Sequence, residues 1–161
     1  MDIFDHAMQM EREGEEYYRE LASRTANSGL KNILNMLADD EAKHFKVFEE
    51  MKEGLTTGIL ATKVLSDAKN IFSEMKRSIA TFDFSGSEKS LYKKALEIEK
   101  KSEEFYREKS DEAELADQKK VLLRIAEEEK KHYLLVENII DFVSKPDTYL
   151  ENAEFFHLDE Y

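Results

Sequence analysis

Two short stretches of this 161-residue sequence place a glutamate three residues before a histidine. They are Glu41-Ala42-Lys43-His44 and Glu129-Lys130-Lys131-His132. Residues three apart share one face of a helix, so each carboxylate can act together with its imidazole. Carboxylate and imidazole ligands suit iron, manganese and zinc, and the absence of cysteine excludes thiolate metal sites, disulfides and a cysteine nucleophile. The two stretches therefore indicate a metal site with oxygen and nitrogen ligands.

Both stretches belong to an internal repeat. Sliding the chain by 88 residues superposes Glu41 on Glu129 and His44 on His132 without a gap. A duplication of this kind predicts two halves with the same structure. Further identical pairs under the same shift are Ala7 with Ala95, Glu11 with Glu99, Tyr18 with Tyr106, Arg19 with Arg107, Leu34 with Leu122 and Ala38 with Ala126.

Each copy of the repeat predicts two helices. Apolar residues recur at spacings of three and four, and turn-forming residues interrupt them at 25–29 and near 113–116. The second helix of each copy carries its glutamate and histidine on the line of residues that a helical bundle buries. In the first copy this line is Leu34, Leu37, Glu41, His44, Phe48 and Met51, and in the second it is Leu122, Ile125, Glu129, His132, Val136 and Ile139.

The stretch between the copies has a looser pattern, in which Ile71, Phe72, Met75 and Ile79 predict one short amphipathic helix. Two tight hairpins with one long connection are typical of the ferritin-like variant of the four-helix bundle. We expect an all-α fold in which the two duplicated antiparallel helical hairpins are joined by a long crossover, and we expect the aromatic C-terminal tail to dock. The predicted bounds are hairpin one at about 3–53, the crossover at about 54–86, hairpin two at about 87–145 and the tail at 146–161, all in one domain, 1–161.

The predicted hairpins place four glutamates, one from the buried face of each long helix, at the same level along the bundle axis. Glu11 and Glu41 lie at similar distances from the first turn, and Glu99 and Glu129 at similar distances from the second. Buried carboxylates repel one another unless they are protonated or bound to cations. Two divalent cations would cancel four negative charges with both histidines neutral, so the spacing predicts a site for two metal ions at the bundle centre.

With these features, residues 3 to 143 or so resemble the ferritin-like di-iron carboxylate proteins, and among them the rubrerythrins. The resemblance lies in the two Glu-x-x-His stretches and in Ala7-Met8-Gln9-Met10-Glu11 and Ala95-Leu96-Glu97-Ile98-Glu99, each followed seven residues later by a tyrosine. It implies two iron ions, with manganese or zinc as alternatives. It also implies Glu41 and Glu129 as bridging ligands, Glu11 and Glu99 as terminal ones, His44 and His132 as nitrogen ligands, and Tyr18 and Tyr106 as hydrogen-bonding residues around the ligands.

The resemblance implies an oxidoreductase that reduces peroxide or dioxygen, as in defence against oxidative stress. Rubrerythrins usually add a rubredoxin domain with four cysteines, so here we expect electrons from an external donor such as rubredoxin. They also usually have an additional glutamate ligand where this chain has Ser102, which is matched by Gly14 in the first copy. Two alternatives stay open: a ferritin-like or bacterioferritin-like ferroxidase for iron storage, and a metal-free structural bundle. The six methionines are interpreted as core residues, with a haem-binding methionine between subunits, as in bacterioferritins, as the alternative.

Charge and the remaining polar residues complete the expectations. There are 36 acidic and 24 basic residues, for a net charge of -12, which argues against nucleic acid or an anionic membrane as a partner. The first residues lack a targeting pattern, so we expect a cytoplasmic protein, and we expect a homodimer. Asp40 and Glu128 are interpreted as surface charges, with orientation of an imidazole as the alternative, and in the run 127–129 only Glu129 is expected to point inward. Glu15 and Glu103 are expected to be solvated, and His6 and His157 to be structural.

Overall fold

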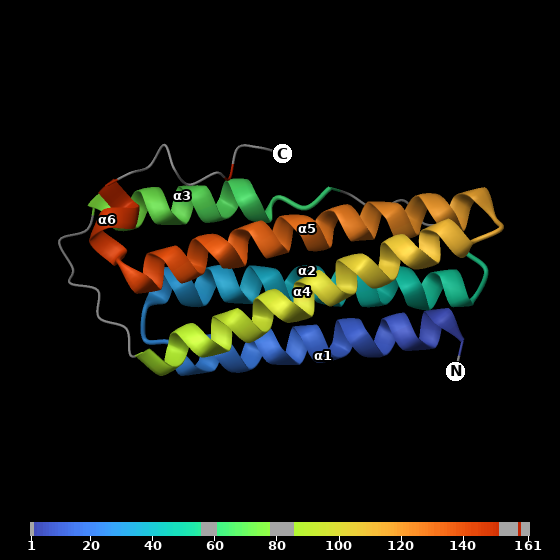
Figure 1. Ribbon diagram of the computed structural model, residues 1–161, viewed down its shortest axis with the longest axis horizontal. Helices are drawn as coiled ribbons and strands as arrows, with labels where there is room; N and C mark the ends of the chain where they lie inside the picture. The colour runs from blue at the N-terminus through green and yellow to red at the C-terminus, as the bar shows by residue number, and fades with distance from the viewer. Residues whose placement is uncertain (1, 56–60, 78–85, 152–157, 159–161) are drawn as a thin grey trace.

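Helices form nearly all of the structure that surrounds the expected site. The computed structural model describes the chain except for residues 1, 56–60, 78–85, 152–157 and 159–161. No strand occurs among the described residues, and the prediction of an all-α ferritin-like helical bundle is confirmed (Figure 1). The helices are α1 (Ile3–Arg24), α2 (Ser28–Lys52), α3 (Val64–Arg77), α4 (Gly86–Glu112), α5 (Ala116–Ser144) and α6 (Pro146–Glu151).

The four long helices form two antiparallel hairpins, α1 with α2 and α4 with α5. Asn27 ends the first turn and caps α2, because its side chain accepts a hydrogen bond from the backbone N–H of Leu30 at 2.8 Å. In the second hairpin the equivalent cap position is Leu115, which makes no side-chain capping bond. Both hairpins consist of two antiparallel helices, but only the first has a side-chain cap at the start of its second helix.

The apolar core consists of two clusters, one near each end of the bundle. One cluster includes Leu34 and Ile139, and the other includes Phe48 and Leu122. Between them, along the same buried line of each helix, lie the glutamates and histidines of the two Glu-x-x-His stretches. The expected site is therefore a polar layer with apolar packing on both sides.

The crossover and the tail cover one end of the bundle. Helix α3 packs against α2, α5 and α6 (Figure 1), and it begins at Val64, seven residues before the first apolar residue from which a helix was predicted. Tyr149 of α6 is buried and meets Phe72 at a ring separation of 4.9 Å, so the described part of the tail docks as expected. Ile79 and residues 152–157 of the predicted docking segment lie outside the described residues.

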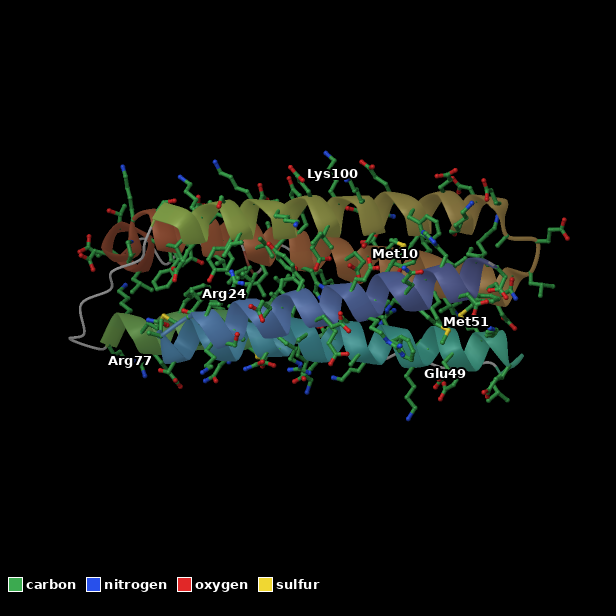
Figure 2. All side chains as sticks on the ribbon, turned by 90° about the horizontal axis from the view of Figure 1, so that it is seen from below. Met10, Arg24, Glu49, Met51, Arg77 and Lys100 are labelled. Carbon is green, nitrogen blue, oxygen red and sulfur yellow. The ribbon has the colours of Figure 1, made fainter. Side chains whose placement is uncertain are left out.

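The outer faces carry charged side chains. Lys100 and Glu49 point away from the bundle, whereas the labelled Met51 is buried (Figure 2). Glu15 pairs with Arg19 at 3.2 Å and Glu103 pairs with Arg107 at 2.8 Å, so these repeated acids form ion pairs at the surface. In the part of the chain that the structure describes, no helix is both long and apolar enough to cross a bilayer.

Candidate metal centre

Six side chains from all four long helices meet in the polar layer between the two apolar clusters. Helices α1 and α4 contribute one glutamate each, and α2 and α5 contribute a glutamate and a histidine each. Each of the six residues is at most 3% exposed. The six sequence-predicted ligands therefore lie together, and they are Glu11, Glu41, His44, Glu99, Glu129 and His132.

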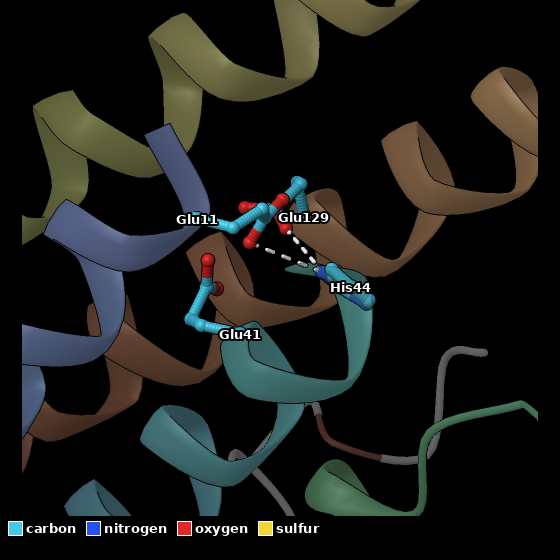
Figure 3. Close-up of side chains that lie close together, drawn as sticks. All are labelled: Glu11, Glu41, His44 and Glu129. Carbon is cyan, nitrogen blue, oxygen red and sulfur yellow. Dashed lines mark hydrogen bonds and ion pairs between the residues drawn. The ribbon is translucent and has the colours of Figure 1, made fainter. Parts of the chain in front are cut away.

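The six residues divide into two groups of four whose ligand atoms lie within 4.8 Å of one another. We call Glu11, Glu41, His44 and Glu129 the His44 group (Figure 3), and Glu41, Glu99, Glu129 and His132 the His132 group. Glu41 and Glu129 belong to both groups. If each group held one cation, Glu41 and Glu129 would be in reach of both cations and Glu11 and Glu99 of one each, as the predicted bridging and terminal roles require.

Each histidine faces a carboxylate of the opposite hairpin. Nδ1 of His44 lies 2.9 Å from Oε1 of Glu129, and Nδ1 of His132 lies 2.9 Å from Oε1 of Glu41. The two imidazoles are stacked with a ring separation of 5.8 Å. Nδ1 is thus the ring nitrogen that points at the shared carboxylates, and neither hairpin contains a complete group by itself.

The other nitrogen of each imidazole is held by a carboxylate that sequence reasoning placed at the surface. Nε2 of His44 lies 2.7 Å from Oε1 of Glu128, and Nε2 of His132 lies 2.9 Å from Oδ2 of Asp40. Glu128 is 3% exposed and Asp40 is 7% exposed, so the surface interpretation was wrong, as was the expectation that only Glu129 of its run points inward. The repeat contained the signal, because acids at these matched positions lie four residues before each histidine.

Two tyrosines cross between the hairpins and hold the terminal glutamates. The Tyr18 hydroxyl donates to Oε1 of Glu99 at 2.5 Å, and the Tyr106 hydroxyl donates to Oε1 of Glu11 at 2.8 Å. Burial and the charge of Glu99 raise the pKa of Tyr18 well above its usual range, and burial with the charge of Glu11 does the same for Tyr106. Both phenols therefore stay protonated and act as hydrogen-bond donors.

Burial and mutual repulsion shift the pKa values of the charged groups in the layer. Burial and the charges of the other buried glutamates raise the pKa of Glu41 and of Glu129 well above the usual range. Burial disfavours a charged imidazole, but Glu11 and its neighbours outweigh this effect and raise the pKa of His44, and Glu99 and its neighbours raise that of His132. The terminal Glu11 and Glu99 are buried, but the facing histidines hold their pKa values below the usual range.

Two observations show that the layer fits a pair of cations. Oε2 of Glu11 and Oε2 of Glu99 are buried and make no hydrogen bond with the described residues, and Oε2 of Glu11 lies 3.5 Å from Nδ1 of His44. Each terminal carboxylate therefore has one oxygen with unused capacity to bind a cation. Gly14 leaves room for the bridging Glu41, because a Cβ at this position would lie 2.9 Å from Oε2 of Glu41. Under the repeat, Gly14 is matched by Ser102, which is also buried, and this pairing alone did not indicate that Glu41 needs the space.

Comparison with known proteins agrees with this geometry. The family model described as Rubrerythrin matches residues 2–140 of the chain. No curated protein matches the chain, and no solved structure matches it. The matched range contains all six residues of the two groups, both tyrosines and both acids that hold Nε2.

Proposed function

This chain belongs to the rubrerythrin family, and from that premise we propose that it is an oxidoreductase that reduces peroxide or dioxygen at a non-haem centre of two iron ions. The observation that carries the proposal is the pair of four-residue groups that share Glu41 and Glu129. Carboxylate-rich groups with one imidazole each suit iron, and manganese and zinc are the competing metals. Because the sequence contains no cysteine, the proposal includes a separate electron donor such as rubredoxin.

A pair of iron ions, when bound, would supply the two electrons that reduction of the O–O bond of the oxidant requires. Reduction of hydrogen peroxide to two water molecules consumes these two electrons and two protons. The protein residues hold the reactants in place. Glu41 and Glu129, which belong to both groups, would hold both cations, and Glu11 and Glu99 would each hold one of them. Tyr18 and Tyr106 donate to the terminal carboxylates and fix their orientation, and apolar clusters pack on both sides of the layer.

The test is anaerobic addition of Fe²⁺ to the metal-free chain, followed by mixing with peroxide or with dioxygen in a stopped-flow instrument. We expect two iron ions per chain and an absorption change on oxidation. Glu129→Gln should reduce binding at both ion sites, because Glu129 belongs to both groups. Glu15→Gln is the matched control, because Glu15 is a repeated glutamate that pairs with Arg19 outside the layer. Unchanged iron content in Glu129→Gln would overturn the ligand assignment.

Iron storage by a ferroxidase is the alternative function for the same ligand set. Storage requires a closed cage of many subunits, whereas we propose a homodimer. Size-exclusion chromatography with light scattering distinguishes the two, because a cage is many times heavier than a dimer. Faster oxidation by peroxide than by dioxygen supports the peroxidase proposal, and a cage that retains oxidised iron supports storage.

A further inference from the structure

Thr62 lies in the crossover just before α3 and contacts both acids that hold the histidines. Its hydroxyl donates to Oδ2 of Asp40, the same oxygen that lies 2.9 Å from Nε2 of His132. Its backbone N–H donates to Oε2 of Glu128 at 3.0 Å, while the other oxygen of Glu128 lies 2.7 Å from Nε2 of His44. One residue outside the repeat therefore connects to both imidazoles through one carboxylate each.

We propose that Thr62 is a positioning residue for the metal centre, holding His132 through its hydroxyl and Asp40, and His44 through its backbone N–H and Glu128. This inference rests on the proposed function, since it concerns the same two groups of ligands. It assigns a role at the site to the crossover, which provides none of the six proposed ligands.

The chemistry of these contacts explains why they matter for metal binding. A carboxylate that accepts from Nε2–H leaves Nδ1 as the nitrogen available to a cation, and it fixes the direction in which the ring points. Asp40 can fix the orientation of the His132 ring, and Glu128 that of the His44 ring, only if the carboxylate oxygens are themselves held in place. Thr62 provides one donor to each acid, because its hydroxyl and its backbone N–H are independent donors.

Water could compensate only in part for loss of the Thr62 hydroxyl. A cavity of about 580 Å³ borders Thr62, Asp40, Glu128 and His44. Water in this cavity can replace a lost donor, but the chain would not fix such a water in place. We therefore expect a partial loss of affinity when the hydroxyl is removed, and not a complete loss.

Thr62 also has a local role that the experiment must separate from the proposed one. Its hydroxyl oxygen accepts from the backbone N–H of Val64 at 3.1 Å, at the start of α3. Thr25 provides the matched control, because its hydroxyl oxygen accepts from the backbone N–H of Asn27, also two residues later, at 3.4 Å, and Thr25 lies in the first hairpin turn. Thr25→Val thus removes the same kind of turn bond at a distance from the layer.

The experiment is a Co²⁺ titration of the full chain, followed by visible absorption, with each ion site tested alone. Glu11→Gln disables the His44 group and leaves the His132 group, and Glu99→Gln does the reverse. Thr62→Val removes the hydroxyl but keeps the backbone N–H. We expect it to lower Co²⁺ affinity about 10-fold in the Glu11→Gln background and to leave affinity within about twofold in the Glu99→Gln background. Thr62→Ser should restore wild-type affinity, and Thr25→Val should change neither site.

A second readout does not need metal. ¹⁵N-labelled histidine in the metal-free protein should show altered ring-nitrogen shifts for His132 but not for His44 in Thr62→Val. In an Asp40→Asn background, Thr62→Val should have no further effect on Co²⁺ affinity, because the pathway through Asp40 is already broken.

The outcomes separate the two levels of inference. If the wild-type chain binds no Co²⁺, the proposed function fails and this inference fails with it. If the wild type binds two ions but Thr62→Val leaves the Glu11→Gln background unchanged, or weakens both backgrounds equally, only the role of Thr62 is overturned. Circular dichroism establishes that each variant is folded, and Thr62→Ser tests the inference even if Thr62→Val is unstable.

Discussion

Each buried imidazole of the layer has a carboxylate within hydrogen-bond distance of both ring nitrogens. These carboxylates determine how the ring is oriented and how readily it takes up a second proton. His44 lies between Glu128 and Glu129, and His132 lies between Asp40 and Glu41. With acids on both sides, each ring can donate from both nitrogens when it is protonated, and the neighbouring acids favour that form by raising the pKa of the ring. A cation that binds at Nδ1 must displace a proton from that nitrogen.

This arrangement predicts that metal binding releases protons and strengthens with pH. The pKa values of both histidines are raised by the surrounding acids, and those of Glu41 and Glu129 are raised by burial and neighbouring charge. All four groups therefore bind protons more tightly than usual in the metal-free protein, and divalent cations should displace protons when they bind. Raising the pH removes these competing protons, so affinity should increase. Calorimetry in buffers of different ionisation enthalpy measures the release.

Binding without proton release, or with affinity that falls between pH 6 and 8, would contradict this description of the layer. The measurement uses Co²⁺, because this ion does not oxidise during a calorimetric titration.

A second prediction at this scale concerns Gly14. Gly14→Ala places a Cβ 2.9 Å from Oε2 of Glu41, so the shared carboxylate must move and both ion sites should weaken, by about 10-fold. Alanine favours a helix over glycine by about 1 kcal/mol, so a loss of binding cannot be explained by a weaker helix. Ser102→Ala at the matched position of the second copy is the control. Equal affinities of Gly14→Ala and wild type would show that Glu41 does not need this space.

At the scale of elements, the two hairpins differ in how their second helices begin. Asn27 caps α2, whereas Leu115 occupies the same place before α5, makes no side-chain cap and is 61% exposed. An uncapped first turn leaves backbone N–H groups to water.

Two substitutions test this difference. Asn27→Ala should lower the free energy of unfolding by about 1 kcal/mol, and Leu115→Asn should raise it by a similar amount. Urea denaturation followed by circular dichroism measures both. Because both positions lie at hairpin turns far from the layer, Co²⁺ affinity should be unchanged. A destabilising Leu115→Asn would mean that this leucine packs in a way that its exposure does not show.

The helices and the meeting of six polar residues were predictable because both follow from local spacing and from the repeat. Glu41 and His44 fall on the apolar line of α2, and a hairpin turn at known distance sets their height. Asp40 lies beside that line, and whether it faces solvent or the opposite histidine depends on how the hairpins cross, which spacing does not specify. Thr62 was not predictable at all, because it lies in the crossover, where no second copy marks it. The role of the six residues as ligands stays a prediction.

At the scale of the whole molecule, the polar layer divides the apolar core in two. Four buried glutamates and two histidines in one layer stabilise the fold only if their charges are balanced. Bound cations would provide this balance for the folded chain and not for the unfolded one.

Metal should therefore raise the thermal stability of the whole bundle. At a free concentration about 1,000 times the dissociation constant, one site adds about 4 kcal/mol, which corresponds to a rise in Tm of about 10 °C for a domain of this size. Calorimetry of the chain with Co²⁺ and with a chelator measures the difference. Glu129→Gln, which lacks a shared ligand, should show a smaller rise. An equal Tm with and without metal in the wild-type chain would contradict a folded-state site.

The reciprocal pairing of the hairpins also has a consequence for ancestry. Every ligand set takes its histidine from one hairpin and a shared glutamate from the other, and the tyrosines cross in the same reciprocal way. Two separate copies of one ancestral hairpin, related by a twofold axis, would already provide the full set of six residues. Fusion of two such copies would need only a connecting segment, and in this chain that segment is a part of the structure with no counterpart under the repeat. Thr62 in this segment contacts the two halves differently: its hydroxyl donates to Asp40 of the first hairpin, and its backbone N–H donates to Glu128 of the second. The two halves of the site are therefore not equivalent in their outer hydrogen bonds.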